Sequence, residues 1–375
     1  MDSPARPFKI GVFSKPLDSW TSGSGHHLDE MMKHVLDLND ANGRPFDFTF
    51  IHYSKSANPI YGRVRELLIP RNPILASLAL RTHRFDILHY SPLSVYAPMF
   101  ALKAKKIATI HGAEEAIYPD GYSFVARIHE RYAMPILARM LDRIATVSET
   151  SRQYYIKEYR VAPERVFLTV NGLSPAMRVL DRKSLTVPAK IGVTGPYIFH
   201  ISRYSTRKNP RCVLEGFARF SATNPGFSLV CAGKGWDCEE VGELARDLSI
   251  SDRLITPGFI DESEAVELLN GATAFLFPSF AEGFGIPNVE AMACGCPVVT
   301  SSAFAIPEVT GGAAVLLKDA TDYDECASAL GRIARDGAYR EELARKGLSR
   351  AGRFDWNESA AALMRAYREM VGIQS

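Results

Sequence analysis

Two glutamates flank a short glycine-containing turn in the second half of the chain. Glu282 and Glu290 have seven residues between them, and Gly283 and Gly285 lie within that stretch. The helix expected next has Pro287 in its first turn, and Glu290 would share that turn. Glycines let a backbone approach a ligand, and the free N–H groups at a helix start attract anions. The segment therefore predicts a diphosphate site, with Glu290 near a ribose and Glu282 near an attached sugar. The alternative is that one glutamate complements the helix dipole and the other is solvated.

A basic cluster follows the apolar strand expected at Tyr197–Ile201 and contains Arg203, Arg207 and Lys208. Cations at the carboxyl end of a parallel strand can reach a diphosphate, arginine through paired hydrogen bonds and lysine as a point charge. Arg207, between the other two, is expected to face solvent. The alternative is a solvated basic turn with no ligand.

Two features of the first half could also contribute to a site. The stretch Ser22-Gly23-Ser-Gly25-His-His follows the first apolar run and precedes a helical pattern, so it is expected to be a glycine-rich loop. His111 ends another apolar run, although a lone histidine is usually structural. The third glycine of a dinucleotide-binding fingerprint is missing from the loop, which disfavours a dehydrogenase.

The elements that must position these residues alternate between apolar, β-branched runs and helical patterns, as in parallel sheets covered on both faces. The runs expected as strands are Phe8–Ser14, Phe46–Ser54, Phe85–Ser91, Lys106–Gly112, Arg143–Ser148 and Arg165–Gly172, then Tyr197–Arg203, Phe227–Gly233, Arg253–Phe259, Ala272–Ser279, Pro297–Ser301 and Ala313–Lys318. Helices are expected at His26–Leu38 and Glu239–Leu248. The pattern predicts an α/β protein with two Rossmann-like, doubly wound domains that face each other across a cleft and bind ligands at the carboxyl ends of their strands.

The expected domain boundary is a stretch at 181–196 that contains Lys, Pro and Gly and shows no clear periodicity. This linker separates an N-terminal domain at 1–180 from a C-terminal domain at 197–355. Residues 356–375 contain a helical pattern that follows the completed second sheet. We expect this last helix to pack elsewhere, with the N-terminal domain as the candidate.

The second half closely resembles the retaining glycosyltransferases of family 4, also called glycosyl transferases group 1, which have the two-domain GT-B fold. The resemblance rests on the run Glu-Gly-Phe-Gly-Ile-Pro-x-x-Glu-Ala-Met-Ala-Cys-Gly-x-Pro-Val-Val that starts at Glu282, on Pro307-Glu308-Val309, on Gly311-Gly312-Ala313-Ala314 and on Asp322. It covers nearly the whole chain but is looser in the first half. There, Gly112 follows His111 in place of the aspartate that many relatives carry, so any acidic partner of His111 is left open.

The resemblance implies a role for each candidate residue. Catalysis and orientation of the transferred sugar are assigned to Glu282 and His111. The donor diphosphate is assigned to Arg203, Lys208, Gly23, Gly25, Gly283, Phe284, Gly285 and Ile286. The nucleoside is assigned to Glu290, Gly258, Phe259 and Ile260, and the weaker candidates near the site are Asn171, Gly233 and Lys234. The N-terminal domain would bind the acceptor, and the C-terminal domain the nucleotide sugar.

These roles predict a retaining glycosyltransferase that moves a hexosyl unit from a nucleoside diphosphate sugar to a hydroxyl of a glycan, lipid-linked or small-molecule acceptor. A UDP-sugar is the first expected donor and GDP-mannose the second. Two alternatives are a sugar-nucleotide epimerase of similar fold, which the Glu-x7-Glu element disfavours, and a non-catalytic two-domain sugar-binding protein, which would not need a diphosphate site.

No cofactor or metal is expected beyond the donor, which is a co-substrate. The acidic pair Asp322-Tyr-Asp324 could hold a divalent cation, but it also opens an expected helix, where aspartate is favoured as a cap. Cys294 and Cys296 lack a second pair of ligands at zinc spacing. A metal-independent reaction is therefore predicted.

The net charge and the lengths of the apolar runs limit which partners and which location can be expected. Lys and Arg number 44 and Asp and Glu 42, so net charge gives no reason to expect nucleic acid. No run approaches the roughly 20 apolar residues that span a bilayer. Met1–Lys9 is polar, and the apolar region and small-residue cleavage site of a signal peptide are not expected after it. A reduced, cytoplasmic protein is expected.

Arginines recur among apolar residues in two segments, Tyr61–Phe85 and Arg127–Arg143. Helices of this composition can lie on anionic membranes, which would place the protein peripherally on the inner face of a membrane. Ordinary amphipathic helices that face a core are the alternative.

Overall fold

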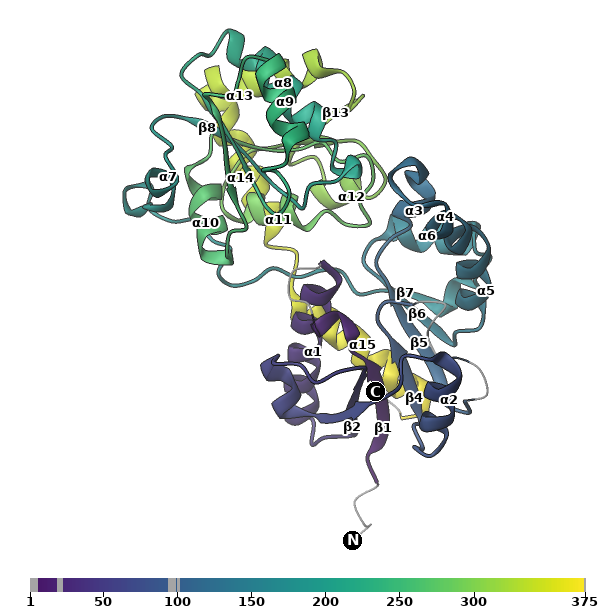
Figure 1. Cartoon of the computed structure of the whole chain (residues 1–375). Helices are drawn as coiled ribbons and strands as arrows, with labels where there is room; N and C mark the ends of the chain where they lie inside the picture. The colour runs from purple at the N-terminus through teal and green to yellow at the C-terminus, as the bar shows by residue number, and fades with distance from the viewer. Residues whose placement is uncertain (1–5, 19–22, 94–98, 100–101, 374–375) are drawn as a thin grey trace. The chain divides into compact units, whose positions relative to one another are not determined.

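The computed structural model describes residues 6–18, 23–93, 99 and 102–373, and it divides the chain into two compact units (Figure 1). Unit 1 comprises Met1–Ala116, Ser123–Gly172 and Asp355–Ser375, and unit 2 comprises Ile117–Tyr122 and Leu173–Phe354. Both units contain a parallel sheet with helices, so the predicted α/β class with two Rossmann-like domains is confirmed.

Unit 1 is built on a seven-stranded parallel sheet in the order β3-β2-β1-β4-β5-β6-β7. The strands are β1 (Phe8–Phe13), β2 (Phe46–His52), β3 (Arg65–Leu68), β4 (Ile87–Tyr90), β5 (Lys105–Ile110), β6 (Arg143–Thr146) and β7 (Val166–Leu168). The main helices are α1 (Gly23–Ala41), α2 (Pro73–Arg81), α3 (Glu114–Ile117), α4 (Phe124–Ile128), α5 (Met134–Arg139), α6 (Glu149–Lys157) and α15 (Trp356–Val371), with the π-helical turn η4 (His129–Ala133) between α4 and α5.

The edge strand β3 was not predicted. It lies within a segment that we expected to be helical, and its residues Arg65 and Glu66 are exposed. Charged side chains are common on edge strands because they discourage pairing with other chains, and they remove the apolar pattern that would identify the strand. The first residues of that segment, up to Arg63, end a 3-10 turn, and its α-helix is α2, whose start is capped by Asn72.

Unit 2 is built on a six-stranded parallel sheet in the order β10-β9-β8-β11-β12-β13. The strands are β8 (Tyr197–Ile201), β9 (Ser228–Ala232), β10 (Leu254–Gly258), β11 (Ala274–Phe277), β12 (Val298–Ser301) and β13 (Val315–Leu317). The helices and short helical turns are η6 (Arg182–Ser184), α7 (Val187–Lys190), η7 (Thr206–Lys208), α8 (Pro210–Ala222), α9 (Glu239–Asp247), α10 (Glu262–Gly271), α11 (Ile286–Ala293), α12 (Ile306–Thr310), α13 (Tyr323–Arg335) and α14 (Gly337–Ala351). Each predicted strand of this half is present, because these strands are short apolar runs.

The stretch expected to link the domains, 181–196, lies inside unit 2. Its two helical turns, η6 and α7, are held by side chains of unit 2. The Glu267 carboxylate on α10 accepts hydrogen bonds from the backbone N–H groups of Thr186 (2.6 Å) and Val187 (2.9 Å). The chain instead passes between the units at 116/117, 122/123, 172/173 and 354/355.

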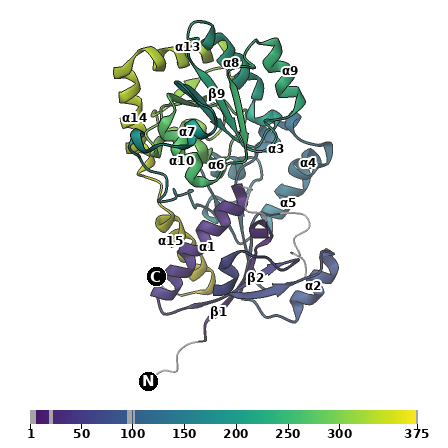
Figure 2. The same ribbon diagram turned by 60° about the vertical axis from the view of Figure 1, so that its left-hand side comes forward.

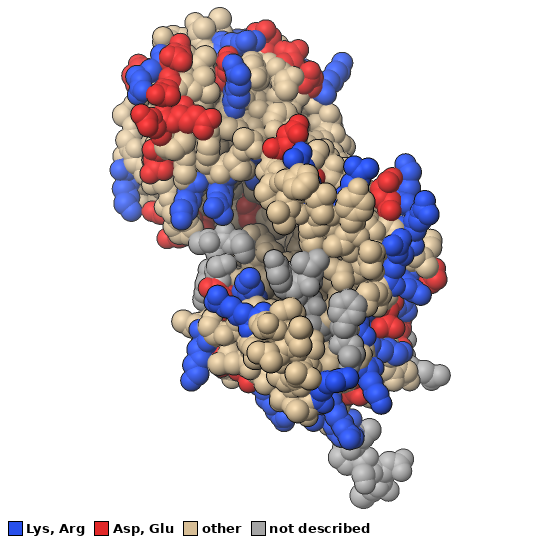
Figure 3. All heavy atoms as spheres, turned by 45° about the vertical axis from the view of Figure 1, so that its right-hand side comes forward, with Lys and Arg blue, Asp and Glu red and all other residues tan. Residues whose placement is uncertain are grey.

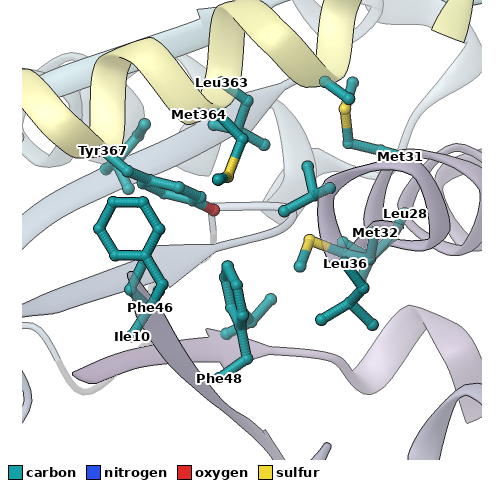
Figure 4. Packing of buried hydrophobic residues seen from close by; sticks show 14 of the residues in the cluster. Ile10, Leu28, Met31, Met32, Leu36, Phe46, Phe48, Leu363, Met364 and Tyr367 are labelled. Atoms are coloured by element: carbon teal, nitrogen blue, oxygen red, sulfur yellow. The ribbon is translucent and has the colours of Figure 1, made fainter. Parts of the chain in front are cut away.

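The core of unit 1 is completed by α15, which lies beside α1 in both ribbon views (Figures 1 and 2). Asp355 caps the start of α15, and the buried side chains Leu363, Met364 and Tyr367 belong to the same cluster as α1 and the first strands. Figure 4 shows these three side chains pointing toward Phe46 and the α1 residues. The helix at the C-terminal end of the sequence is therefore part of the N-terminal fold.

Helix α15 also joins a polar pair in the same core. The Tyr367 hydroxyl lies 2.6 Å from Nδ1 of His89 on β4, and Nε2 of His89 lies 2.9 Å from the Thr109 hydroxyl. Burial lowers the pKa of His89 to about 3, so this histidine is neutral at physiological pH.

No helix in the described part of the chain is long and apolar enough to cross a membrane.

Candidate active site

The sheet of unit 2 reverses its strand order between β8 and β11, where doubly wound sheets bind ligands. The chain after β8 forms the turn η7, which carries Arg207 and Lys208, and the chain after β11 runs through 278–285 to the start of α11. Because both strands end at the same edge of the sheet, the two segments meet there. The predicted basic cluster and the Glu-x7-Glu element are thereby brought together.

An ion cluster joins the two segments. The Lys208 ammonium lies 2.5 Å from Oε1 of Glu282, and the Arg207 guanidinium lies 2.9 Å from the same oxygen. Lys208 also lies over the Phe277 ring, with its Nζ 4.7 Å from the ring centroid. Glu282 is 7% exposed, and burial would raise its pKa, but Lys208 and then Arg207 outweigh burial and lower the pKa. Glu282 is therefore an ionised carboxylate.

The main chain that carries Glu282 is held residue by residue. Four of its carbonyl groups accept hydrogen bonds. Asn209 Nδ2 donates to the Pro278 carbonyl (3.2 Å) and Ser301 Oγ to the Ser279 carbonyl (2.5 Å). Arg207 Nη1 donates to the Ala281 carbonyl (2.6 Å) and the Ala305 N–H to the Glu282 carbonyl (3.4 Å). The Phe280 N–H donates to the Arg207 carbonyl at 2.9 Å, and the Phe280 ring stacks on Tyr118 at 4.9 Å. Such support fixes a functional side chain in place before any ligand binds.

Arg203 and Arg207 differ from what the sequence suggests. The prediction that Arg207 faces solvent is wrong, because its side chain is 20% exposed and contacts the Glu282 segment. Its place in a turn that is hydrogen bonded to Phe280 directs it inward. Arg203 is exposed and has no hydrogen bond or ion pair with any described residue. It stays a predicted diphosphate ligand.

Helix α11 begins after Gly285, whose left-handed backbone (φ 86°) suits glycine and turns the chain into the helix. No side chain caps this helix start, so its N-terminal end is available to an anion. Phe284 is buried and packs edge-on against Phe354 at 5.4 Å, so it supports the turn from the protein side. Gly283 and Ile286 flank this turn.

Glu290 is the fifth residue of α11, and the prediction that it lies in the first turn is wrong, because the helix starts at Ile286. In the second turn it gains little from the helix dipole, so dipole complementation does not explain it. Burial first and the Glu262 carboxylate second raise the pKa of Glu290 to about 7. Glu290 can therefore carry a proton near neutral pH and donate as well as accept a hydrogen bond.

The ends of β8, β9 and β10 lie together beside this site. The Ser202 N–H donates to the Ala232 carbonyl at 3.1 Å, and the Gly233 N–H donates to the Gly258 carbonyl at 2.7 Å. Among the nearby candidates, Lys234 and Phe259 are exposed and Ile260 is buried. The Phe259 ring, 70% exposed, is an apolar surface at the edge where a nucleoside base is predicted.

The candidates of unit 1 gather around a histidine that we did not predict. Asn171, which follows β7, has its Oδ1 atom 2.6 Å from Nδ1 of His27 on α1. The His27 ring stands edge-on to His111, which follows β5, with ring centroids 4.5 Å apart. The Nε2 atoms of both histidines are buried without a partner among the described residues. His27 thus connects two residues that the sequence suggested separately.

The expected glycine-rich loop is mostly helix. Gly23 and Gly25 lie in the first turn of α1, which begins three residues earlier than predicted, and Ser22 lies outside the described residues. Burial, with His111 second, holds the pKa of His27 well below its usual range, and burial, with His89 second, lowers that of His111 to about 4. Both histidines are therefore neutral, and no carboxylate is among the causes for His111.

No group of three metal-ligating side chains lies together in the described ranges of the chain. Asp322 accepts hydrogen bonds from the backbone N–H groups of Asp324 (3.0 Å) and Glu325 (2.9 Å) and so caps α13, while Asp324 pairs with Arg219 at 2.7 Å. Both carboxylates of the acidic pair thus have structural partners. The six cysteines are free thiols.

Two family models match successive parts of the chain. "Glycosyltransferase Family 4" matches residues 34–176 and "Glycosyl transferases group 1" matches residues 181–350. The chain belongs to glycosyltransferase family 4. It is a hexosyltransferase that uses a nucleotide-sugar donor and has the GT-B fold.

The names of similar proteins mention different sugars and acceptors. This chain is 28% identical over 324 residues to the O-antigen chain mannosyltransferase B of Escherichia coli, and the match covers 83% of this chain and 80% of that protein. It is also 28% identical over 243 residues to the D-inositol 3-phosphate glycosyltransferase of Acidothermus cellulolyticus, covering 61% of this chain and 53% of that protein. Anabaena Alr3699/HepE, solved with UDP and glucose, shares the fold with a TM-score of 0.79 at 16% identity, covering 96% of this chain and all of that one.

Proposed function

We propose that this glycosyltransferase moves a hexosyl unit from a UDP-sugar to an acceptor hydroxyl with retention of the anomeric configuration and without a metal. The observation that carries this proposal is the ionised Glu282 between Arg207 and Lys208, beside the uncapped start of α11. This arrangement offers positive charge for a diphosphate and a fixed anion for the attached sugar.

In the proposed reaction, Arg203, Lys208 and the start of α11 bind the diphosphate and stabilise the charge that develops as it leaves. Glu290 binds the ribose, and Glu282 orients the sugar through its hydroxyls. The bond between the anomeric carbon and the phosphate oxygen breaks, and the acceptor oxygen bonds to that carbon on the same face. The acceptor proton moves to the leaving phosphate oxygen, so no protein nucleophile is needed.

A second donor, GDP-mannose, is favoured by one observation. The O-antigen chain mannosyltransferase B of Escherichia coli is similar over 83% of this chain. The UDP-bound Anabaena relative shares the fold at 16% identity and supports UDP only through that likeness. The exposed Phe259 could stack on either base, so the two donors must be separated by experiment.

Binding and turnover with each donor test this proposal. UDP and UDP-sugars should raise the unfolding temperature more than GDP and GDP-mannose at equal concentration, because a bound ligand stabilises the folded state by RT ln(1 + [L]/Kd). Turnover, followed as acceptor-dependent release of nucleoside diphosphate, should persist after exhaustive EDTA treatment. Activity that is lost and that only Mg²⁺ or Mn²⁺ restores would contradict the metal-free reaction. Larger shifts with GDP and GDP-mannose would favour a guanosine donor.

The acceptor side has an unusual surface in unit 1. On α4, η4 and α5 the apolar side chains of Phe124, Val125, Ile128, Tyr132 and Ile136 are exposed, Val125 by 75%. Arg127 lies over the Phe124 ring and Arg131 over the Tyr132 ring. These positions do not face the core, so the alternative of ordinary amphipathic core helices does not hold for them. We call this surface the α4–α5 face.

We propose that the α4–α5 face docks on anionic lipid and that the acceptor is lipid-linked. Exposed aromatic and aliphatic side chains flanked by arginines match an anionic membrane surface in both apolar character and charge. Figure 3 shows many Lys and Arg side chains on the side of unit 1 that carries these helices, with some Asp and Glu side chains among them, beside uncharged surface. Helix α2, in the other arginine-containing segment, also exposes Ile74, Leu75 and Leu78.

Vesicle co-sedimentation should show binding to phosphatidylglycerol that weakens at high salt, and little binding to phosphatidylcholine. Replacing both Phe124 and Val125 with aspartate should reduce binding at least about tenfold, since two apolar contacts are lost and two like charges face the lipid. Leu348→Asp, on an exposed position of α14 in unit 2, is the matched control. No sedimentation even at low salt would favour a soluble acceptor.

A further inference from the structure

Arg207 contacts three consecutive residues of the segment that carries Glu282. Its carbonyl accepts the Phe280 N–H at 2.9 Å, and its Nη1 atom donates to the Ala281 carbonyl at 2.6 Å and lies 2.9 Å from Oε1 of Glu282. One side chain therefore binds both the main chain just before Glu282 and the Glu282 carboxylate. Among the described residues, Lys208 is the other cation within ion-pair distance of that carboxylate.

The two cations differ in what they can fix. The Lys208 ammonium is a point charge that attracts the carboxylate from one side. The Arg207 guanidinium is planar with donors in a rigid arrangement, so binding a carbonyl and a carboxylate together defines the direction of the Glu282 side chain relative to its own backbone. Orientation of a group that touches the substrate matters because a misplacement of about 1 Å can cost about 100-fold in rate.

We propose that Arg207 is a positioning residue that holds the Glu282 carboxylate aimed at the transferred sugar. This inference rests on the proposed role of Glu282 toward that sugar. Arg207 is not assigned to the diphosphate, because its guanidinium is occupied by Ala281 and Glu282, whereas exposed Arg203 is free of described partners.

The segment should survive the loss of the guanidinium. The carbonyls of Pro278, Ser279 and Glu282 are held by Asn209, Ser301 and Ala305, and the Phe280 N–H bonds to the main chain of residue 207. These contacts do not involve the Arg207 side chain. A substitution there therefore releases the Glu282 carboxylate and the Ala281 carbonyl, while the rest of the segment stays held.

The pH dependence of activity, which follows the ionisation of Glu282, should change if Arg207 acts on Glu282 and should stay the same if Arg207 only supports the fold. The titratable groups that act on Glu282 are Lys208, Arg207 and His200, and burial holds the pKa of His200 at about 3, so it is neutral. With Arg207 neutralised, one of the two cations that oppose burial is lost, and the pKa of Glu282 rises. Since the anion is the active form, the acidic limb of the kcat/KM profile should move to higher pH.

The test compares Arg207→Gln, Arg207→Lys and Arg211→Gln across a pH series. Arg211 is an exposed arginine at the start of α8 that pairs only loosely with Glu215, at 3.6 Å, and serves as the matched control. Arg207→Gln should lower kcat about 10- to 100-fold with little change in donor KM, and shift the acidic limb upward. Arg207→Lys should restore the pH of the acidic limb but not the full rate, because lysine restores the positive charge without the planar, rigid donors of the guanidinium. Arg211→Gln should match the unmodified protein.

Each other outcome overturns the assignment. Unchanged kcat and an unchanged acidic limb in Arg207→Gln would remove any role in positioning Glu282. A parallel fall in UDP affinity, measured by calorimetry, would make Arg207 a diphosphate ligand instead. If Arg207→Gln fails to fold, a normal rate of Arg207→Lys would show that the planar guanidinium is not needed to position Glu282. Full turnover of Glu282→Gln would refute the role of Glu282 itself, whereas an inactive Glu282→Gln with a normal Arg207→Gln would refute only the role of Arg207.

Discussion

Glu282→Ala should lose most of its turnover, with kcat falling about 100- to 1,000-fold, the usual effect of removing an electrostatic contact to the reacting group. Affinity for the nucleoside diphosphate should stay equal or become tighter. The reason is that the carboxylate now neutralises Lys208 and Arg207, which lie 2.5 Å and 2.9 Å from it, and its removal frees Lys208 for the phosphates. Initial rates at saturating donor and calorimetry with UDP give both quantities.

Two further variants make this result specific. Glu282→Gln keeps the size of the side chain and should be nearly as inactive, because the charge is lost. Glu215→Ala removes a glutamate that also pairs with two arginines, Arg211 and Arg219, on α8, and should retain full activity. Because two cations lose their partner in Glu282→Ala, unfolding must be measured alongside. Near-normal turnover of folded Glu282→Ala would exclude the proposed role.

Tyr367→Ala should destabilise unit 1 by about 3–5 kcal/mol, the range for truncating a buried aromatic side chain. Tyr367 is fully buried on α15, with its ring centroid 5.8 Å from Phe46 and 6.1 Å from Phe48. Tyr367→Phe keeps this packing but removes the partner of His89 Nδ1, which should cost about 1–3 kcal/mol. Denaturant unfolding, with hydrogen exchange to assign the loss to unit 1, gives these values.

A tyrosine on the surface of the same unit controls for the aromatic substitution. Tyr132→Ala, at an exposed position, should leave the free energy of unfolding within about 0.5 kcal/mol of the original. Equal effects of Tyr132→Ala and Tyr367→Ala would mean that α15 does not belong to the core of unit 1. Loss of exchange protection in unit 2 rather than unit 1 would have the same meaning.

The strands were predictable wherever they are buried on both faces. Ala274–Phe277 is entirely apolar and bounded by turn residues, and it forms β11 as expected. Arg65–Leu68 carries charges on an edge and has no such pattern, so β3 could not be recognised. The stretch at 181–196 looks like a linker because it lacks periodicity, yet the Glu267 carboxylate on α10 binds two of its backbone N–H groups.

The residues of the candidate site could be predicted from the sequence better than the contacts between their side chains. Lys208 and Glu282 follow strands that end at one edge, so their meeting could be anticipated from topology. The direction of a side chain in a three-residue turn is not encoded in spacing, and Arg207 was therefore misjudged. His27 contacts Asn171 across 144 residues of sequence, and its only local mark is its place after Gly25.

The place of α15 in unit 1 has a consequence for the order in which the protein can fold during synthesis. Residues 355–375 are made after the whole of 173–354, so unit 2 has nearly all of its sequence before unit 1 does. Until then, the nascent chain exposes the apolar side chains of α1 and the first strands that α15 covers, such as Met32 and Phe48. Exposed surface of this kind favours aggregation and engages chaperones. A chain that ends before residue 355 would therefore contain the whole sequence of unit 2 but lack one helix of the core of unit 1.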